Sequence, residues 1–323
     1  MDNALILFET DPAFNEKLGH ILNGYNIIFS DCKDGSSVDA KTAENTTIIF
    51  GNPKVEFLKL CPRLKWLQLH SAGAAEYTTG VLNETVLLSC SSGCYGHAVS
   101  EHMVGLSFAL FKKLHLYRDE QLKGRWQDRG EVKSIQGAVV LVVGVGDLGS
   151  NYAKRMKALG SYVIGVDLRT FAKPDYLDEF YQLDQLEEHL ARCDLLALTV
   201  PGIKDNAGLI GRAQLAKMKK DAVLINAGRG NAIDTDALYD ALQSGALGAA
   251  GLEVTEPEPL PSGHRLWKLE NALITPHVAG GRHLPNTVQY ILELWLENSR
   301  RFVQGEALKS QVDYKTGFKK PNT

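Results

Sequence analysis

The sequence predicts an α/β fold built from two bodies, each with a sheet of parallel strands. Short apolar runs alternate with amphipathic, helix-like stretches along most of the chain, which is typical of parallel α/β layers. A glycine-rich turn joins one apolar run to a helix-like stretch at residues 144–149. The length of 323 residues allows about two domains.

The first body is predicted from strand-like runs near the N-terminus. Asp11-Pro12 predicts a helix start after the first run, because proline is favoured in the first turn of a helix. Val55–Leu60 predicts a further helix. The strand-like runs are Ala4–Phe8, Ile27–Phe29, Thr47–Phe50, Lys65–Leu69 and Val86–Leu88.

A long helix is predicted over His97–Tyr117. Its middle is apolar on most faces, which indicates burial on more than one side. We therefore expect this helix to connect the two bodies and to lie between them.

The second body repeats the alternation of strands and helices. Its predicted strands are Ala138–Val143, Tyr162–Val166, Leu195–Val200, Ala222–Asn226, Gly248–Val254 and Ala272–Thr275. The predicted helices between them are Leu148–Leu159, Leu183–Leu190, Gly211–Met218 and Asp234–Gln243.

The end of the chain predicts a return to the first body. An amphipathic stretch, Pro285–Val303, follows Gly280-Gly281 and predicts a last helix. We expect one domain of residues 1–98 completed by residues 286–323, with residues 99–285 inserted as the second domain.

Composition excludes several classes of partner. The chain has 35 Lys and Arg against 38 Asp and Glu, a net charge of −3, which argues against nucleic acid or a membrane surface as partner. The 5 cysteines are scattered without a CxxC pair, which favours a reducing compartment. The N-terminus lacks the pattern of a signal peptide, and no apolar run is long enough to span a membrane. We expect a cytoplasmic protein.

The glycine-rich turn predicts a dinucleotide site on a Rossmann-type, doubly wound sheet. The strand-like Val139–Val143 leads directly into Gly144-Val145-Gly146-Asp147-Leu148-Gly149, and a helix-like stretch follows. In such a turn Gly144 allows the tight bend, Gly146 lets the backbone approach a pyrophosphate, and Gly149 lets helix and strand pack closely. The N–H groups of Asp147 and Leu148 would then face the anion.

Asp167 predicts a preference for NAD over NADP. It ends the next strand-like run, where a carboxylate accepts hydrogen bonds from the ribose hydroxyls and repels a 2′-phosphate. Arg169 could offset part of that repulsion.

Three further side chains follow predicted strands. Arg229 lies in Asn226-Ala227-Gly228-Arg229-Gly230, Glu258 in the proline-rich loop from Glu253 to Pro259, and His277 after Pro276. Open α/β sheets bind ligands at the carboxyl ends of their strands. Guanidinium grips a carboxylate or carbonyl, imidazole exchanges a proton near neutral pH, and a carboxylate orients the imidazole. Glu256 is two residues from Glu258, so either could serve.

Together these motifs resemble the D-isomer-specific 2-hydroxyacid dehydrogenase family, which includes D-lactate, glyoxylate/hydroxypyruvate, D-2-hydroxyisocaproate and 3-phosphoglycerate dehydrogenases. The resemblance covers essentially the whole chain. It rests on Ser71-Ala72-Gly73, on Tyr95-Gly96 with Val99, Glu101 and His102, on the turn at Gly144, on Asn226–Gly230, on Glu253–Pro259 and on Pro276-His277.

The resemblance implies reduction of a 2-oxoacid by NADH, with His277 as general acid/base, Glu258 as its partner and Arg229 as the substrate clamp. It implies that backbone N–H groups near Ala72, Gly73 and Ala74 hold the substrate carboxylate, and Tyr95 could reach the substrate. Glu253 matches a position, usually Asp, that holds the nicotinamide carboxamide. The remaining implied cofactor contacts are Val200, Pro201, Ala227, Gly228 and Gly280, and Arg229 and His277 are implied to contact the cofactor as well as the substrate.

The resemblance also implies the fold and the assembly: a Rossmann domain inserted into a flavodoxin-like substrate domain, and a homodimer built along residues 97–116. Cys94, His97 and His102 fit no standard metal-ligand spacing, so no metal is expected. A second hypothesis is an NAD(H)-sensing binding protein like the C-terminal-binding corepressors, which resemble this family. The short polar tail after Val303 favours the enzyme.

Overall fold

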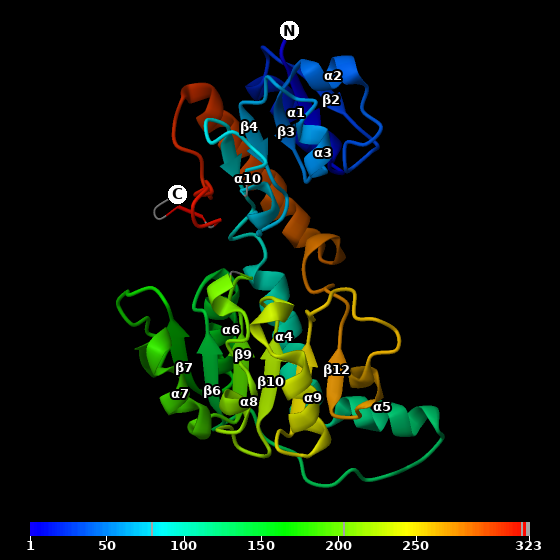
Figure 1. Cartoon of the computed structure of the whole chain (residues 1–323), viewed down its shortest axis with the longest axis vertical. Helices are drawn as coiled ribbons and strands as arrows, with labels where there is room; N and C mark the ends of the chain where they lie inside the picture. The colour runs from blue at the N-terminus through cyan, green and yellow to red at the C-terminus, as the bar shows by residue number, and fades with distance from the viewer. Residues whose placement is uncertain (79, 203, 318, 321–323) are drawn as a thin grey trace. The chain divides into compact units, whose positions relative to one another are not determined.

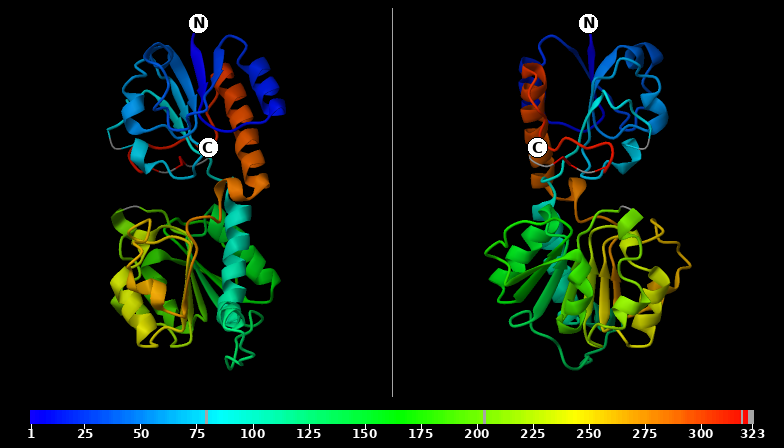
Figure 2. Two further views of the ribbon diagram at one scale, coloured as in Figure 1. Left: turned by 90° about the vertical axis from the view of Figure 1, so that its right-hand side faces the viewer. Right: turned by 60° about the vertical axis from the view of Figure 1, so that its left-hand side comes forward.

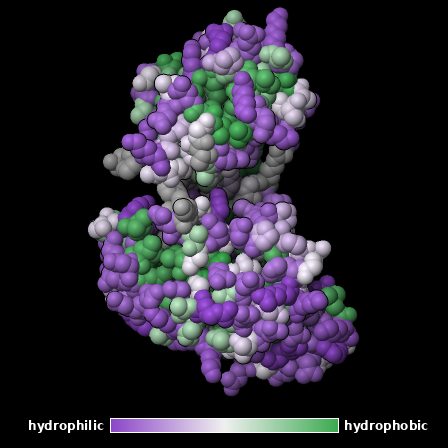
Figure 3. Space-filling model, viewed as in Figure 1, coloured by the Kyte–Doolittle hydropathy of each residue, from purple (hydrophilic) through white to green (hydrophobic). Residues whose placement is uncertain are grey.

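The computed structural model describes residues 1–78, 80–202, 204–317 and 319–320. The chain divides into two compact units (Figure 1): a first unit of Met1–Tyr95 with Leu284–Thr323, and a second unit of Gly96–His283. The boundaries expected after residues 98 and 285 thus fall after Tyr95 and His283. In the view of Figure 3 the surface is largely hydrophilic, with apolar side chains gathered in patches on each unit.

The first unit contains a parallel sheet with the strand order β2-β1-β3-β4-β5. This is the flavodoxin-like order, as predicted. The strands are β1 (Asn3–Ile6), β2 (Asn26–Phe29), β3 (Thr46–Phe50), β4 (Trp66–Gln68) and β5 (Leu87–Ser89).

Helices cover both faces of this sheet because alternate strand residues point to opposite sides. Ile6 packs with residues of α1 (Pro12–Ile21) and α10 (Pro285–Gln304), which lie side by side (Figure 2), whereas Leu5 packs with residues of α3 (Val55–Leu58). Asp11 caps α1 as predicted, since its carboxylate accepts the Phe14 N–H at 2.7 Å. The short elements α2 (Ala40–Glu44) and η1 (Ala75–Tyr77) complete the unit.

A buried polar network ties the returning C-terminal segment to the sheet. The Asn298 side chain on α10 donates to Gln68 Oε1 at 2.8 Å and to the Lys309 carbonyl at 3.0 Å. Ser89 Oγ donates to the same Gln68 oxygen at 2.7 Å. Residues from both ends of the chain therefore belong to one core.

The second unit contains a parallel sheet with the order β12-β11-β10-β9-β6-β7-β8, which is the Rossmann order extended by one strand. The predicted fold class is confirmed. The strands are β6 (Val139–Val143), β7 (Tyr162–Asp167), β8 (Glu179–Gln182), β9 (Leu195–Leu198), β10 (Val223–Asn226), β11 (Ala249–Leu252) and β12 (Ala272–Ile274). The edge strand β8 was not predicted, because its half-buried residues form no apolar run.

The helix predicted over His97–Tyr117 is present but is broken near its C-terminal end. It is divided into α4 (Gly96–Phe111) and α5 (Leu114–Leu122), because the φ of 55° at Lys113 cannot continue a right-handed helix. Within its unit, α4 packs against α6 (Asp147–Ala158), β10 and β11.

The other predicted helices of the second unit are present but mostly shorter. Residues 183–192 form η2 (Leu183–Gln185), α7 (Leu186–His189) and η3 (Leu190–Arg192), and α8 spans only Arg212–Leu215. The remaining elements are η4 (Lys204–Asn206), η5 (Gly230–Ala232), α9 (Thr235–Gln243), η6 (Arg265–Lys268) and η7 (Gly281–His283). None of the described helices combines the length and apolar character that a membrane span requires.

Candidate active site

The carboxyl ends of β10, β11 and β12 bring the predicted chemical groups to one edge of the second sheet. Asn226, Leu252 and Ile274 are aligned in register across these strands. Arg229 lies three residues beyond Asn226, and His277 three beyond Ile274. Arg229 and His277 therefore lie in the loops on either side of the loop that follows β11.

The glycine-rich turn between β6 and α6 has the geometry that a dinucleotide requires. Gly144 has a φ of +89°, and a Cβ on Gly149 would overlap the Gly144 carbonyl. The backbone conformation at Gly144 and the close packing at Gly149 therefore explain why glycine occupies these two positions. A Cβ on Gly146 would meet no atom closer than Arg169 Nη2 at 3.9 Å, so the protein leaves a space there. Together with the N-terminus of α6, that space fits a pyrophosphate.

Asp167 ends β7 beside this turn and is already hydrogen-bonded. Its carboxylate accepts from the Val145 N–H at 2.7 Å and from Arg169 Nε and Nη2 at 2.9 and 3.0 Å. Burial opposes ionisation, but the Arg169 guanidinium and backbone donors outweigh it and lower the pKa of Asp167. The carboxylate stays charged, and a cation lies next to it.

The Arg229 loop passes tightly between its neighbours. A Cβ on Gly228 would overlap the Val200 carbonyl, and one on Gly230 would overlap the Thr255 carbonyl. The buried Asn226 side chain holds the loop by donating to the Arg229 carbonyl at 2.9 Å.

The Arg229 side chain is exposed and donates to the Gly228 carbonyl at 2.8 Å. It forms no ion pair with any described residue. Its guanidinium thus keeps donors available for an anion. Of its neighbours predicted to contact the cofactor, Val200 and Ala227 are buried, whereas Pro201 is exposed.

The side chains of His277 and Glu258 contact each other directly. Nδ1 of His277 lies 2.5 Å from Oε1 of Glu258, and the two side chains are 49% and 40% exposed. The contact leaves Nε2 of the imidazole for a ligand. Within the described part of the chain, Glu256 forms no hydrogen bond or ion pair with His277; its carbonyl accepts from Thr235 Oγ1. The geometry therefore selects Glu258.

His277 has a backbone conformation that L residues rarely adopt, with a φ of 52°. Its N–H is shared between the carbonyls of Glu253 and Thr275, both at 3.0 Å. The loop thus holds the backbone of His277 in a strained conformation, as is common at functional sites. Gly280 follows three residues later and is partly buried.

Glu253 is buried, with its side chain only 2% exposed. Oε1 accepts the Ala279 N–H at 2.5 Å, and Oε2 accepts from Thr275 Oγ1 and lies 3.1 Å from His102 Nε2. Burial opposes ionisation, but these donors outweigh it and lower the pKa of Glu253. The roles of Thr275 and His102 in the site could not be predicted, because the sequence does not show that their side chains contact Glu253.

In the first unit, the Ser71–Ala74 turn is fixed by side chains around it. Asn52 Oδ1 accepts the His70 N–H at 3.0 Å, and Asn52 Nδ2 donates to Ser71 Oγ at 2.8 Å. Ser71 Oγ donates to the Gly73 carbonyl at 2.6 Å. The Tyr95 hydroxyl donates to the His70 carbonyl at 2.5 Å, and burial raises the pKa of Tyr95. Asn52 is a further residue that the sequence analysis missed.

No group of three or more His, Cys, Asp and Glu side chains placed to hold a metal ion occurs among the described residues. His97 Nδ1 lies 2.9 Å from Arg155 Nη2, and His102 contacts Glu253.

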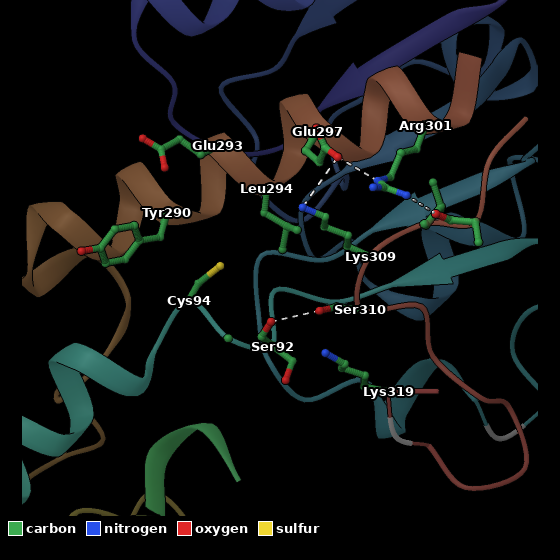
Figure 4. A pocket seen from close by; sticks show the side chains of 13 residues that line it. Ser92, Cys94, Tyr290, Glu293, Leu294, Glu297, Arg301, Lys309, Ser310 and Lys319 are labelled. Atoms are coloured by element: carbon green, nitrogen blue, oxygen red, sulfur yellow. Dashed lines mark hydrogen bonds and ion pairs between the residues drawn. The ribbon is translucent and has the colours of Figure 1, made fainter. Parts of the chain in front are cut away.

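A cavity of about 630 Å³ lies in the first unit between α10 and the loop after β5 (Figure 4). Three of its charged groups pair with one another: Glu297 accepts from Arg301 at 2.8 Å and lies 3.6 Å from Lys309 Nζ. None of the site residues predicted from the sequence lines it. The cavity is therefore separate from the predicted chemistry.

Comparison with known proteins agrees with these features. Residues 104–279 match the family model described as D-isomer specific 2-hydroxyacid dehydrogenase, NAD binding domain. The glycerate dehydrogenase of Methylorubrum extorquens is 31% identical over 78% of this chain and 80% of its own length.

Solved structures of family members also superpose on the whole chain. A D-isomer specific 2-hydroxyacid dehydrogenase family protein from Aeromonas salmonicida has a TM-score of 0.84 at 28% identity, covering 97% of this chain and 100% of its own. A D-isomer specific 2-hydroxyacid dehydrogenase from Xanthobacter autotrophicus, in complex with NADPH and MES, has a TM-score of 0.82 at 26% identity, covering 98% and 100%. The chain thus belongs to the D-isomer specific 2-hydroxyacid dehydrogenase family and is an NAD(P)-dependent oxidoreductase.

Proposed function

We propose that the protein interconverts a small 2-oxoacid and its D-2-hydroxyacid, with His277 as general acid/base, Glu258 as its partner and Arg229 as the substrate clamp. The observation that carries this proposal is the 2.5 Å contact between His277, in the loop after β12, and Glu258, in the loop after the neighbouring strand β11. Arg229 follows β10, the next strand beyond β11, and forms no ion pair with any described residue. In this proposal the second unit binds the dinucleotide and supplies Arg229, Glu258 and His277.

The dinucleotide is held by the turn from Gly144 to Gly149, with its pyrophosphate in the space at Gly146 and its ribose near Asp167. Val200, Pro201, Ala227, Gly228 and Gly280 are proposed to line the rest of its site. When bound, the reduced nicotinamide supplies the hydride that adds to C2 of the 2-oxoacid.

Arg229 provides the positive charge for the substrate. Its planar guanidinium can donate to the carboxylate and to the 2-oxo oxygen at once. The backbone N–H groups of Ala72, Gly73 and Ala74 are proposed to bind the carboxylate as well, in the turn that Asn52 and Tyr95 fix. Only the donor on the 2-oxo oxygen meets charge that develops during the reaction, and such a donor typically contributes about 3–4 kcal/mol.

His277 supplies the proton. As the 2-oxo oxygen gains negative charge, the free Nε2 of the imidazole donates to it, and in the reverse direction Nε2 accepts the hydroxyl proton. Glu258 on Nδ1 keeps the ring oriented and stabilises its protonated form.

The preferred coenzyme is proposed to be NAD(H), because the Asp167 carboxylate disfavours a 2′-phosphate. The Arg169 guanidinium, paired with Asp167 at 2.9 Å, weakens this preference because it could turn to such a phosphate. Because the Xanthobacter relative was solved in complex with NADPH, both NADH and NADPH have to be assayed.

We propose that the protein is a homodimer. Exposed apolar side chains follow α4 rather than lie within it: Leu114, Leu122 and Trp126 are 53%, 68% and 106% exposed. The buried Glu120 holds this segment by accepting from Arg125 Nη2 at 2.8 Å. Light scattering of the wild type and of Trp126→Ser tests the proposal, since a dimer that uses this surface weakens in the variant.

The experiment that tests the function is oxidation of NADH and NADPH with a panel of 2-oxoacids: glyoxylate, hydroxypyruvate, pyruvate, 2-oxoisocaproate and phosphohydroxypyruvate. Hydroxypyruvate belongs in the panel because it is the 2-oxoacid of glycerate, the substrate named for the Methylorubrum relative. We expect turnover with at least one acid, a D-2-hydroxyacid product and faster turnover with NADH. Bound NADH without turnover of any acid would contradict the proposal.

A further inference from the structure

Glu253 anchors the loop that carries His277 at three points. Its main-chain carbonyl accepts the His277 N–H at 3.0 Å, Oε1 accepts the Ala279 N–H at 2.5 Å, and Oε2 accepts from Thr275 Oγ1. The side-chain anchors thus lie two residues before and two residues after His277. We propose that Glu253 is a positioning residue for His277 and that His102 in turn holds Glu253. The proposal rests on the proposed role of His277.

The strained backbone of His277 explains why such anchoring is needed. A φ of 52° is unfavourable for a residue with a Cβ, so a free loop would relax and the imidazole would turn away. A general acid must lie within hydrogen-bond reach of the atom that it protonates. The three bonds to one buried glutamate therefore keep His277 in a productive orientation.

His102 completes the arrangement from helix α4. Its Nε2 lies 3.1 Å from Glu253 Oε2 and 3.0 Å from Thr275 Oγ1. All donors are satisfied if the imidazole N–H points between these two oxygens and the threonine hydroxyl points at the carboxylate. The groups that face the glutamate are then one imidazole from α4, and one hydroxyl and one backbone N–H from the loop.

This role differs from the one that the family resemblance implies. There the residue, usually an aspartate, accepts a hydrogen bond from the nicotinamide carboxamide. Here both oxygens of the longer glutamate already accept from protein donors, and the side chain is 2% exposed. The extra methylene lets the carboxylate reach across to Ala279, which an aspartate on the same backbone would not reach.

The test compares Glu253→Asp and Glu253→Gln with wild type, with Glu256→Gln as the matched control from the same loop. We expect kcat to fall about 10- to 100-fold in both Glu253 variants, as for a displaced catalytic group, while the Kd for NADH changes less than about twofold. Amide hydrogen exchange of residues 275–279 should accelerate in both. The control should match wild type in all three measurements.

His102 gives a second pair of variants in case the Glu253 variants do not fold. His102→Gln retains an N–H that can donate to Glu253, whereas His102→Ala does not. We expect the glutamine variant to keep more of the wild-type kcat and slower exchange of residues 275–279 than the alanine variant. Equal values in the two variants would count against the proposed role of His102.

The outcomes separate this inference from the proposed function. If the Glu253 variants weaken NADH binding about tenfold or more but keep kcat at saturating NADH and wild-type exchange, the glutamate contacts the cofactor and the positioning role is wrong. If wild type reduces no 2-oxoacid, or His277→Ala keeps full activity, the proposed function fails. Hydrogen exchange still decides in that case whether Glu253 and His102 hold the loop.

Discussion

Nδ1 of His277 and Oε1 of Glu258 lie 2.5 Å apart, although the two residues are 19 positions apart in the chain. Each belongs to a loop that follows a strand of the second sheet, and the strands β11 and β12 are direct neighbours. The contact is therefore a consequence of strand order.

Replacement of Glu258 by Gln should lower kcat about 10- to 100-fold, because a neutral amide orients the imidazole but no longer stabilises its protonated form. Steady-state kinetics of Glu256→Gln are the control, which should match wild type. A kcat of Glu258→Gln equal to that of wild type would show that this carboxylate does not act on His277.

Replacement of Arg229 by Lys should raise KM for the 2-oxoacid and lower kcat about 100-fold, because a point charge replaces a planar fork. Binding of NADH, followed by fluorescence, should change little. Arg212→Lys is a suitable control, since Arg212 pairs with Asp240 at 2.7 Å on the surface. Wild-type kinetics in Arg229→Lys would remove the guanidinium from the proposed site.

Replacement of Arg169 by Ala should increase the preference for NADH over NADPH, about tenfold in the ratio of kcat/KM values. The variant leaves the Asp167 carboxylate without its guanidinium partner, so its negative charge repels a 2′-phosphate more strongly. Asp167→Ala should shift the ratio in the opposite direction. Equal ratios in both variants and wild type would place the adenosine ribose elsewhere.

Cys32 should react first with iodoacetamide near pH 8. Its hydrogen bond to Asp34 opposes ionisation, but donors from Ser36 and Ser37 outweigh this and lower the pKa of Cys32. Burial raises the pKa of Cys61 and of Cys193 to about 12, so these thiols stay protonated until much higher pH. Mass spectrometry of the labelled native protein measures the order, and prior labelling of Cys61 or Cys193 would contradict it.

The sheets could be predicted from the sequence because their strands are buried on both faces and read as apolar runs, such as Val139–Val143. The edge strand Glu179–Gln182 could not, since one side of it is open and its residues are mixed. The break at Lys113 was also missed, because no local pattern indicates the positive φ of this residue.

The positions of Arg229 and His277 at the carboxyl edge of the sheet could be predicted, because each residue closely follows a strand that the sequence predicts. Residue order alone does not show whether Glu256 or Glu258 contacts His277, because this depends on the path of the proline-rich loop. The contacts of Asn52, His102 and Thr275 join segments far apart in the chain, so only the folded structure reveals them.

The most direct test of the account is the kcat of His277→Ala with the best 2-oxoacid of the panel, measured together with the Kd for NADH. We expect kcat to fall about 100-fold or more, because no other group in this loop can deliver the proton. The affinity for NADH should stay close to that of wild type. Turnover near the wild-type rate at saturating substrate would contradict the account.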